Sequence, residues 1–205
     1  CVLAVDEAFI DFLPAEWSLL KVPAELPANV IVIRSLTKFY AIAGLRVGLL
    51  TAAPELMAKL AVRIPDWSVN AMAIAAGVAA LLHCSDFEHK TRLEIERLKT
   101  RLTGQLTAAG LTVFPGMANF LLLRLPHPIP DFAVRLLREH RIALRECSNF
   151  PGLDYRYFRI GLRGEADNDC LAAAIVTVCG KSVTAFNIPA RHHTPALMLQ
   201  GTSSD

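Results

Sequence analysis

The stretch VIVIRSLTKFYAIAGLRVG at residues 30–48 decides the fold. Four consecutive β-branched residues at 30–33 predict a short buried strand, and Ser35 and Lys38 follow it directly. Arg46 stands between two glycines near the end of the stretch. Small residues let the backbone approach a phosphate, and a hydroxyl together with a guanidinium suits a phosphate dianion. The stretch therefore predicts a strand that leads into a phosphate site beside a lysine.

A second apolar run, VLAV at residues 2–5, ends in Asp6. Both runs predict buried strands of one parallel sheet, and ligands of such sheets collect beyond the carboxyl ends of the strands. Asp6, Ser35 and Lys38 would meet there. This set, with Arg46, suits pyridoxal phosphate: the lysine forms the Schiff base, and a buried carboxylate keeps the ring nitrogen protonated. The alternatives are a solvated surface lysine and an aspartate that caps a helix.

Composition excludes several other classes of protein. The chain has 205 residues, 53% of them hydrophobic, and a formal charge of 21 − 19 = +2 without any basic run, which argues against a nucleic-acid surface. Five cysteines without CxxC spacing indicate reduced thiols in a cytoplasmic protein. We expect no metal site, because the histidines lack ligand spacing. We expect no membrane segment either, and the alanine-rich stretch at residues 71–82 is interpreted as a buried helix.

The pattern divides the chain into a partial α/β large domain over residues 1–85, a small α+β domain over residues 86–180, and a tail over residues 181–205 that is expected to be disordered. The large domain has expected strands at 2–6, 30–35 and 46–51. A long helix is expected from residue 85 to 109, ended by Gly110. The small domain then has expected strands at 111–114, 119–124, 142–146 and 156–162, and helices at 130–140 and 166–179.

The first strand has no partner before it in the sequence, although a buried strand needs neighbours on both sides. We therefore expect the chain to be the later part of a longer polypeptide.

Two arginines are candidates for binding anions. Arg159 lies in an otherwise apolar strand, where an inward arginine needs a partner. The partner could be a substrate carboxylate held by two hydrogen bonds, or a structural acid. Arg145, at the end of the preceding strand, is a similar but weaker candidate for a second anion.

Several motifs resemble those of the fold-type I pyridoxal-phosphate enzymes. These are Asp6-Glu7-Ala8-Phe9, Ser35-Leu36-Thr37-Lys38-Phe39-Tyr40 and Gly44-Leu45-Arg46-Val47-Gly48. Within that superfamily the chain is similar to the histidinol-phosphate aminotransferase branch, and above all to the threonine-phosphate decarboxylases of cobalamin synthesis. The stretches that narrow the resemblance are Trp67-Ser68-Val69-Asn70-Ala71, Ala118-Asn119-Phe120 and Asn149-Phe150-Pro151-Gly152-Leu153-Asp154. The resemblance covers residues 1–180.

The resemblance implies a role for each candidate. Lys38 matches the Schiff-base lysine and Asp6 the partner of the pyridinium nitrogen. Ser35 and Arg46 match phosphate ligands of the cofactor. Arg159 matches the arginine that binds the substrate carboxylate, and Arg145 the arginine that meets the substrate's own phosphate.

The resemblance also implies a reaction: PLP-dependent decarboxylation of threonine phosphate to aminopropanol phosphate by a lyase that is a homodimer at full length. One departure from the aminotransferases is Phe9, which stands where they usually have a tyrosine, and it fits the decarboxylase branch. The alternatives are an aminotransferase of the histidinol-phosphate type and an inactive fragment. The glycine loop and stacking aromatic of these enzymes precede the matched region, so we expect this chain alone to bind the cofactor weakly or not at all.

The last eleven residues, 195–205, resemble the opening of cobyric acid synthase. The resemblance suggests a fused or overlapping neighbouring gene, and the alternative is a chance match in a tail.

Overall fold

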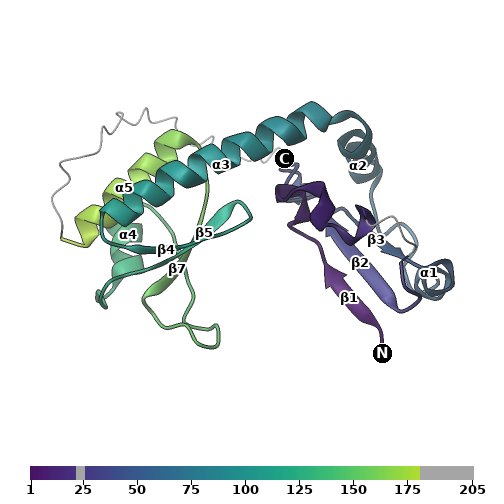
Figure 1. The fold of residues 1–205 in the computed structure, drawn as a ribbon, viewed down its shortest axis with the longest axis horizontal. Helices are drawn as coiled ribbons and strands as arrows, with labels where there is room; N and C mark the ends of the chain where they lie inside the picture. Colours follow the sequence, from purple (N-terminus) through teal and green to yellow (C-terminus); the bar gives the residue numbers. More distant parts are fainter. Residues whose placement is uncertain (22–25, 181–205) are drawn as a thin grey trace, which may run out of the picture.

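A computed structural model describes residues 1–21 and 26–180 of the chain. The described residues form two lobes, each built on its own sheet, and one long helix runs along both (Figure 1). The N-terminal lobe holds a three-stranded sheet with the order β1-β2-β3. The C-terminal lobe holds a four-stranded sheet with the order β4-β5-β7-β6. The expected class, a partial large α/β unit of the aspartate aminotransferase type followed by a small α+β unit, is confirmed.

The central strand of the first sheet is β2 (Val30–Ser35), which pairs in parallel with β1 (Leu3–Asp6) and antiparallel with β3 (Gly48–Ala52). The prediction of a buried β2 is right for the side chains on one face, since Val32 is fully buried. The prediction of a buried β1 is wrong, because Leu3 is 56% exposed. The reason is that β1 has one neighbouring strand and no described element packs over its outer side.

The described part of the connection between β1 and β2 contains the 3-10 turns η1 (Ile10–Phe12), η2 (Ala15–Trp17) and η3 (Leu19–Lys21). A fourth, η4 (Ala43–Leu45), precedes β3.

Two helices follow β3, namely α1 (Pro54–Ala61) and α2 (Ala71–His83). Asn70 caps α2, as its side chain accepts a hydrogen bond from the backbone N–H of Ala73 at 2.9 Å. The prediction that α2 is a buried helix is wrong, because only its small residues on one side are buried and Leu82 is 69% exposed. Among the described helices none is by itself long and apolar enough for a bilayer, and α2 with the next helix reaches that length only with an 82° bend.

The long helix α3 spans Ser85–Ala108 and belongs to both lobes. Its buried positions Leu98, Leu102 and Leu106 recur at helical spacing, and Leu102 and Leu106 pack in the core against the second sheet. The helix ends at Gly110, whose φ of 82° is left-handed and therefore costs glycine little. The expected helix and its end are confirmed.

The C-terminal lobe consists of β4 (Thr112–Phe114), β5 (Phe120–Arg124), α4 (Phe132–His140), β6 (Arg145–Glu146), β7 (Tyr157–Gly161) and α5 (Glu165–Val178). Its core lies between one face of the sheet and the helices α3, α4 and α5. The expected strand at 142–146 is shortened to two residues, since Arg141 is left-handed (φ 58°) and residues 142–144 leave the ladder. The expected tail lies outside the described residues.

A buried carboxylate joins α3 to α5. Asp169 accepts hydrogen bonds from Arg101 at 3.1 and 2.8 Å and from Gln105 at 2.7 Å. The hydrogen bonds from the Arg101 guanidinium hold the pKa of Asp169 below its usual value. A depressed pKa stabilises the fold above the pKa of the unfolded chain, and this stabilisation is lost as the pH falls through the lower pKa of the folded state.

We therefore expect Asp169→Asn to lower the Tm by about 3 °C at pH 7, which is about 1 kcal/mol for a chain of this size. The difference from wild type should shrink as the pH is lowered from 7 towards 2. Thermal unfolding across that pH range measures it. The control is Asp167→Asn, because Asp167 pairs with Arg163 on an exposed helix face, where such pairs contribute little. A pH-independent difference would contradict the assignment.

Candidate functional site

The lysine loop, which we define as residues 35–40, includes the last residue of β2 and the turn after it. Several of its side chains are buried, and its one amine is exposed to solvent. Leu36, Thr37 and Phe39 are buried, whereas Lys38 is exposed. The Lys38 Nζ donates a hydrogen bond to the Ser35 Oγ at 3.2 Å, and Ser35 shares a second hydroxyl contact with Thr37 at 2.7 Å. The loop therefore places an amine and two hydroxyls together, on a support fixed by the core.

Asp6 lies at the carboxyl end of β1, beside β2, with Ile33 as its register partner. It accepts a hydrogen bond from the backbone N–H of Ala8 at 2.8 Å. The expectation of a buried carboxylate is wrong for this structure: Asp6 is exposed, because no described element covers the outer side of β1. Both it and Lys38 stand at the same end of the sheet, as the sequence predicted.

The neighbouring Glu7 is buried and has a structural role. It accepts hydrogen bonds from the Ser18 hydroxyl and from the backbone N–H of Leu19, both at 2.8 Å. These contacts fix the segment that follows β1.

Arg46 reaches the site through the pairing of β3 with β2. Its backbone is left-handed, with φ of 54°, and its guanidinium donates to the Ala43 carbonyl at 3.1 Å while staying exposed. Two residues later, Gly48 pairs directly with Ser35. A Cβ on Gly48 would lie only 2.7 Å from the Arg34 carbonyl oxygen, so glycine is what allows this close approach. The register of β3 on β2 thus brings Arg46, and the turn that contains it, next to the lysine loop.

In the second lobe, Arg145 and Arg159 are register partners across β6 and β7. Directly opposed residues of an antiparallel pair point to the same face, where like charges destabilise the sheet. Within the described residues neither arginine forms an ion pair; Arg145 donates to the Asn149 Oδ1 at 2.9 Å. The inward orientation expected for Arg159 is wrong, because Phe158 and Ile160 on either side of it point into the core. Two opposed guanidiniums without ion-pair partners among the described residues could together accept an anion.

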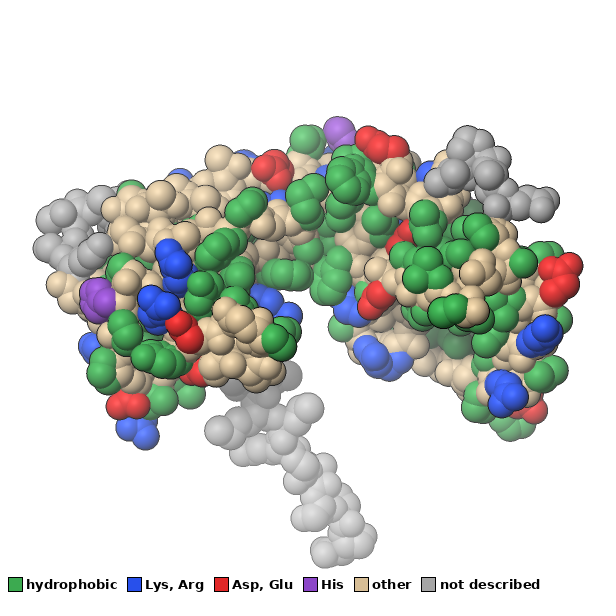
Figure 2. Space-filling model, turned by 60° about the horizontal axis from the view of Figure 1, so that its bottom comes forward, with side chains coloured by type: hydrophobic (Ala, Val, Ile, Leu, Met, Phe, Trp, Pro, Cys, Tyr) green, Lys and Arg blue, Asp and Glu red, His purple; other side chains and the backbone are tan. Residues whose placement is uncertain are grey.

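An aromatic contact connects the two lobes at the site. The Lys38 Nζ lies 5.7 Å from the ring centroid of Phe9, and this ring meets Phe120 of β5 edge to face at 5.5 Å. The Arg159 guanidinium lies 5.4 Å from the centroid of Phe120. Two adjoining rings therefore separate the amine from the arginine pair. Figure 2 shows the two lobes on either side of a notch, with Lys and Arg side chains on both walls.

Phe120 is a site residue that the sequence argument missed. The alternation of β5 carries a signal, since Leu121 and Leu123 are buried and Phe120 must therefore lie on the opposite face. Its contact with Phe9 joins residues far apart in the chain and has no local signature.

The class I and II aminotransferase family model matches residues 1–175. The chain belongs to this family. A threonine-phosphate decarboxylase of Salmonella typhimurium is 44% identical over 178 residues, which cover 86% of this chain and 48% of that protein. A histidinol-phosphate aminotransferase of Oleidesulfovibrio alaskensis is 43% identical over 156 residues, which cover 73% of this chain and 40% of that protein. The chain thus spans about half or less of the length of these relatives.

A third relative matches along the whole chain. The adenosylcobalamin biosynthesis bifunctional protein CobDQ of Leptospira interrogans is 33% identical over 207 residues, 100% of this chain and 23% of that protein. This match includes residues 181–205, which the structure leaves undescribed. It agrees with the cobalamin-related resemblance of the tail, and the fusion itself stays a hypothesis.

A solved structure identifies the cofactor of the fold. Histidinol-phosphate aminotransferase from Sinorhizobium meliloti in complex with pyridoxal-5'-phosphate has a TM-score of 0.76 and 26% identity, and covers 86% of this chain and 48% of that one. The cofactor of this aminotransferase-family chain is pyridoxal 5'-phosphate. The donor set fits it: Lys38 for the aldehyde carbon, Asp6 for the ring nitrogen, and Ser35 with Arg46 for the phosphate. Gly48 itself adds no side chain beside Ser35.

We expect Gly48→Ala to destabilise the fold by about 1–3 kcal/mol, because the added Cβ forces β2 and β3 apart beside Ser35. Urea unfolding measures the effect as a lower midpoint. Gly44→Ala is the matched control, since a Cβ there meets nothing within 4 Å. Equal midpoints for the two variants would show that the Ser35–Gly48 pairing tolerates a side chain.

Proposed function

We propose that the full-length polypeptide containing this chain is a lyase that decarboxylates L-threonine O-3-phosphate to (R)-1-aminopropan-2-yl phosphate in cobalamin biosynthesis. The observation that carries the proposal is the opposed pair Arg145 and Arg159, two unpaired guanidiniums on one open face. Threonine phosphate has two anionic groups, a carboxylate and a phosphate, and can occupy both arginines at once. Histidinol phosphate has a phosphate but no carboxylate. The names of two relatives, a threonine-phosphate decarboxylase and a protein of adenosylcobalamin biosynthesis, support the same assignment.

The site residues then have separate tasks. Arg159 holds the substrate carboxylate and Arg145 the substrate phosphate, which fixes the α-carbon between them and Lys38. The bound cofactor supplies a ring that accepts the electron pair released when the carboxylate leaves as CO2. Asp6 keeps a positive charge near that ring by accepting a hydrogen bond from its nitrogen. Lys38 delivers a proton from its Nζ to the α-carbon, so that a C–H bond replaces the C–C bond that was broken.

Phe9 supports the decarboxylase over an aminotransferase. Its ring lies against both Lys38 and Phe120, and it has no hydroxyl that could donate a hydrogen bond to the cofactor.

The alternative is an aminotransferase of the histidinol-phosphate type, in which the Lys38 amine removes the α-proton instead of returning one. A relative that is 43% identical favours it.

The proposal also includes the assembly and the location: the full-length protein forms a homodimer in the cytoplasm. It acts on small phosphorylated amino acids and has no nucleic-acid or membrane partner. Exposed apolar side chains on α2, such as Met72 at 73%, offer a surface for the second subunit.

The full-length polypeptide should release CO2 from threonine phosphate without any 2-oxo acid. Cofactor trapped by borohydride should label Lys38 stoichiometrically, and Lys38→Arg should abolish both the label and CO2 release. Mass spectrometry of peptides measures the label, with Lys59 on α1 as an internal control for random modification. Amino transfer that requires 2-oxoglutarate, with no CO2 released, would establish the aminotransferase instead, and an unlabelled Lys38 would leave the inactive fragment.

The arginine pair predicts two distinct defects. Arg145→Lys should lower kcat/KM for threonine phosphate about tenfold to a hundredfold, the loss of a bidentate charged contact, and should leave the slow reaction of L-threonine unchanged. Arg159→Lys should lower kcat/KM for threonine phosphate and for L-threonine, because both substrates have a carboxylate. Arg163→Lys is the control, as Arg163 pairs with Asp167 on the surface. A variant at Arg145 that still prefers the phosphorylated substrate would contradict its role.

A further inference from the structure

Tyr40 ties the lysine loop to the long helix α3. Its hydroxyl donates a hydrogen bond of 2.6 Å to the Glu88 Oε1 in the first turns of α3. The ring is buried against Phe39 and Phe87, with centroids 5.3 and 6.0 Å away. Burial, followed by the hydrogen bond to Glu88, raises the pKa of Tyr40. The hydroxyl therefore stays protonated, and remains a donor, through neutral and moderately alkaline pH.

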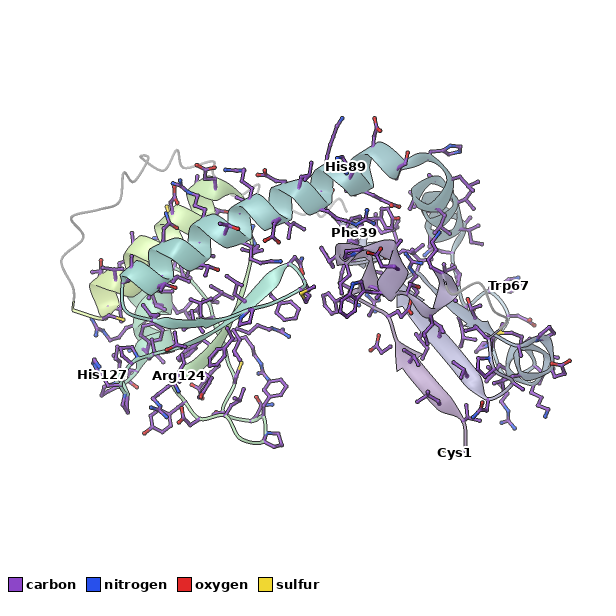
Figure 3. All side chains as sticks on the ribbon, viewed as in Figure 1. Cys1, Phe39, Trp67, His89, Arg124 and His127 are labelled. Carbon is purple, nitrogen blue, oxygen red and sulfur yellow. The ribbon has the colours of Figure 1, made fainter. Side chains whose placement is uncertain are left out.

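Arg92, one turn further along α3, adds two contacts to the same place. Its guanidinium donates to the Glu88 Oε2 at 3.3 Å and to the Asp11 carbonyl at 2.8 Å. It also lies over the Phe39 ring, 5.4 Å from the centroid. Figure 3 shows Phe39 directly beneath α3. The start of the helix thus touches both residues that follow Lys38.

A buried ion pair completes the connection to β2. The Asp11 carboxylate, 3% exposed as a residue, accepts from Arg34, which lies four positions before Lys38. The group Asp11, Arg34, Tyr40, Glu88 and Arg92, which we call the α3 clamp, therefore holds the helix against the lysine loop from both sides.

The far half of α3 holds the lobe that bears the arginine pair. Leu102 and Leu106 lie fully buried in the C-terminal core, and Arg101 pairs with Asp169 of α5. Leu106 lies 18 positions after Glu88, which is about 27 Å along the helix, so a tilt of about 5° at the clamp moves the far end by about 2 Å. Misplacement of reacting groups by about 1 Å can lower a rate about a hundredfold. The angle of α3 on the lysine loop therefore matters for any reaction between Lys38 and a substrate held by Arg159.

We propose that Tyr40 and Glu88 are positioning residues, which set the location of the arginine pair relative to Lys38 by fixing α3 on the lysine loop. The proposal rests on the proposed function for the identity of the reaction, but not for the contact itself. Neither residue touches the substrate or the cofactor, and both act through α3.

The first test is hydrogen exchange on the full-length polypeptide with Tyr40→Phe, which removes the hydroxyl and keeps the ring. Exchange in residues 85–92 and 36–41 should rise about tenfold, the factor expected for one charge-assisted hydrogen bond. Exchange in residues 98–106 should not change. Tyr155→Phe is the matched control, because Tyr155 is 58% exposed and lies in the connection between β6 and β7. Unchanged exchange in residues 85–92 would overturn the proposal.

The second test separates positioning from folding. In Tyr40→Phe, borohydride-trapped cofactor should label Lys38 as in wild type, while kcat for CO2 release from threonine phosphate falls about tenfold and KM changes less than twofold. Glu88→Gln, which keeps an acceptor for the hydroxyl, should retain most of the rate. Glu88→Leu, which also removes the acceptor of Arg92, should lose at least as much rate as Tyr40→Phe, and the double variant should be no worse than Glu88→Leu alone. A fall in kcat that only matches a fall in Lys38 labelling would show a merely structural role. Additive losses of rate in the double variant would show the same.

The two proposals fail separately. An unlabelled Lys38 in wild type overturns the proposed function, and the exchange measurement then still decides whether the clamp holds α3.

Discussion

The backbone hydrogen bonds of β2 fix the relative positions of the candidate cofactor ligands. β1 pairs with it in parallel and delivers Asp6, while β3 pairs with it antiparallel and delivers the turn of Arg46. Ser35 is the last residue of β2 itself, and Lys38 follows in the loop after it. Because three segments share one ladder, a carboxylate, an amine, a hydroxyl and a guanidinium meet at one end of the sheet without long-range contacts between side chains. The proposed anion site for the substrate, Arg145 with Arg159, belongs to the other sheet.

The second sheet meets the first through two connections of different character. Near the site, the rings of Phe9 and Phe120 touch edge to face, which is a small and apolar contact. Farther away, α3 packs Leu102 and Leu106 into the second core, and its first turns make polar and aromatic contacts to the lysine loop. The aromatic contact can slide, whereas the helix transmits its angle over its whole length. This division explains why polar groups gather where α3 meets the lysine loop, since hydrogen bonds fix direction and apolar contacts do not.

Local signals predicted much of this structure. The β-branched run of β2 and the glycine that follows α3 each depend on residues close together in the chain, and both the strand and the helix end are confirmed. The grouping of Asp6 with the lysine loop followed from a general rule about parallel strands. The predictions of burial were wrong for β1 and α2. Both segments are apolar, but their exposure depends on which elements cover them, and no local sequence pattern encodes that.

The orientation of Arg159 was a different kind of error, and one the sequence could have prevented. Phe158 and Ile160 flank it, and this alternation marks a strand with one buried face, so the arginine had to point outward. Its position opposite Arg145 depends on strand register, and the contact of Phe120 with Phe9 depends on how the lobes meet. Neither can be obtained from spacing.

The opposed arginines also have a consequence for handling the protein. Two neighbouring cations repel each other until a counter-ion lies between them, so an oxyanion of the medium that occupies the pair favours the native state over the unfolded one. Sulfate or phosphate in a buffer should therefore protect the molecule against heat more than chloride at equal ionic strength. The difference in thermal stability between these salts would therefore report whether β6 and β7 pair in the register that opposes the two arginines.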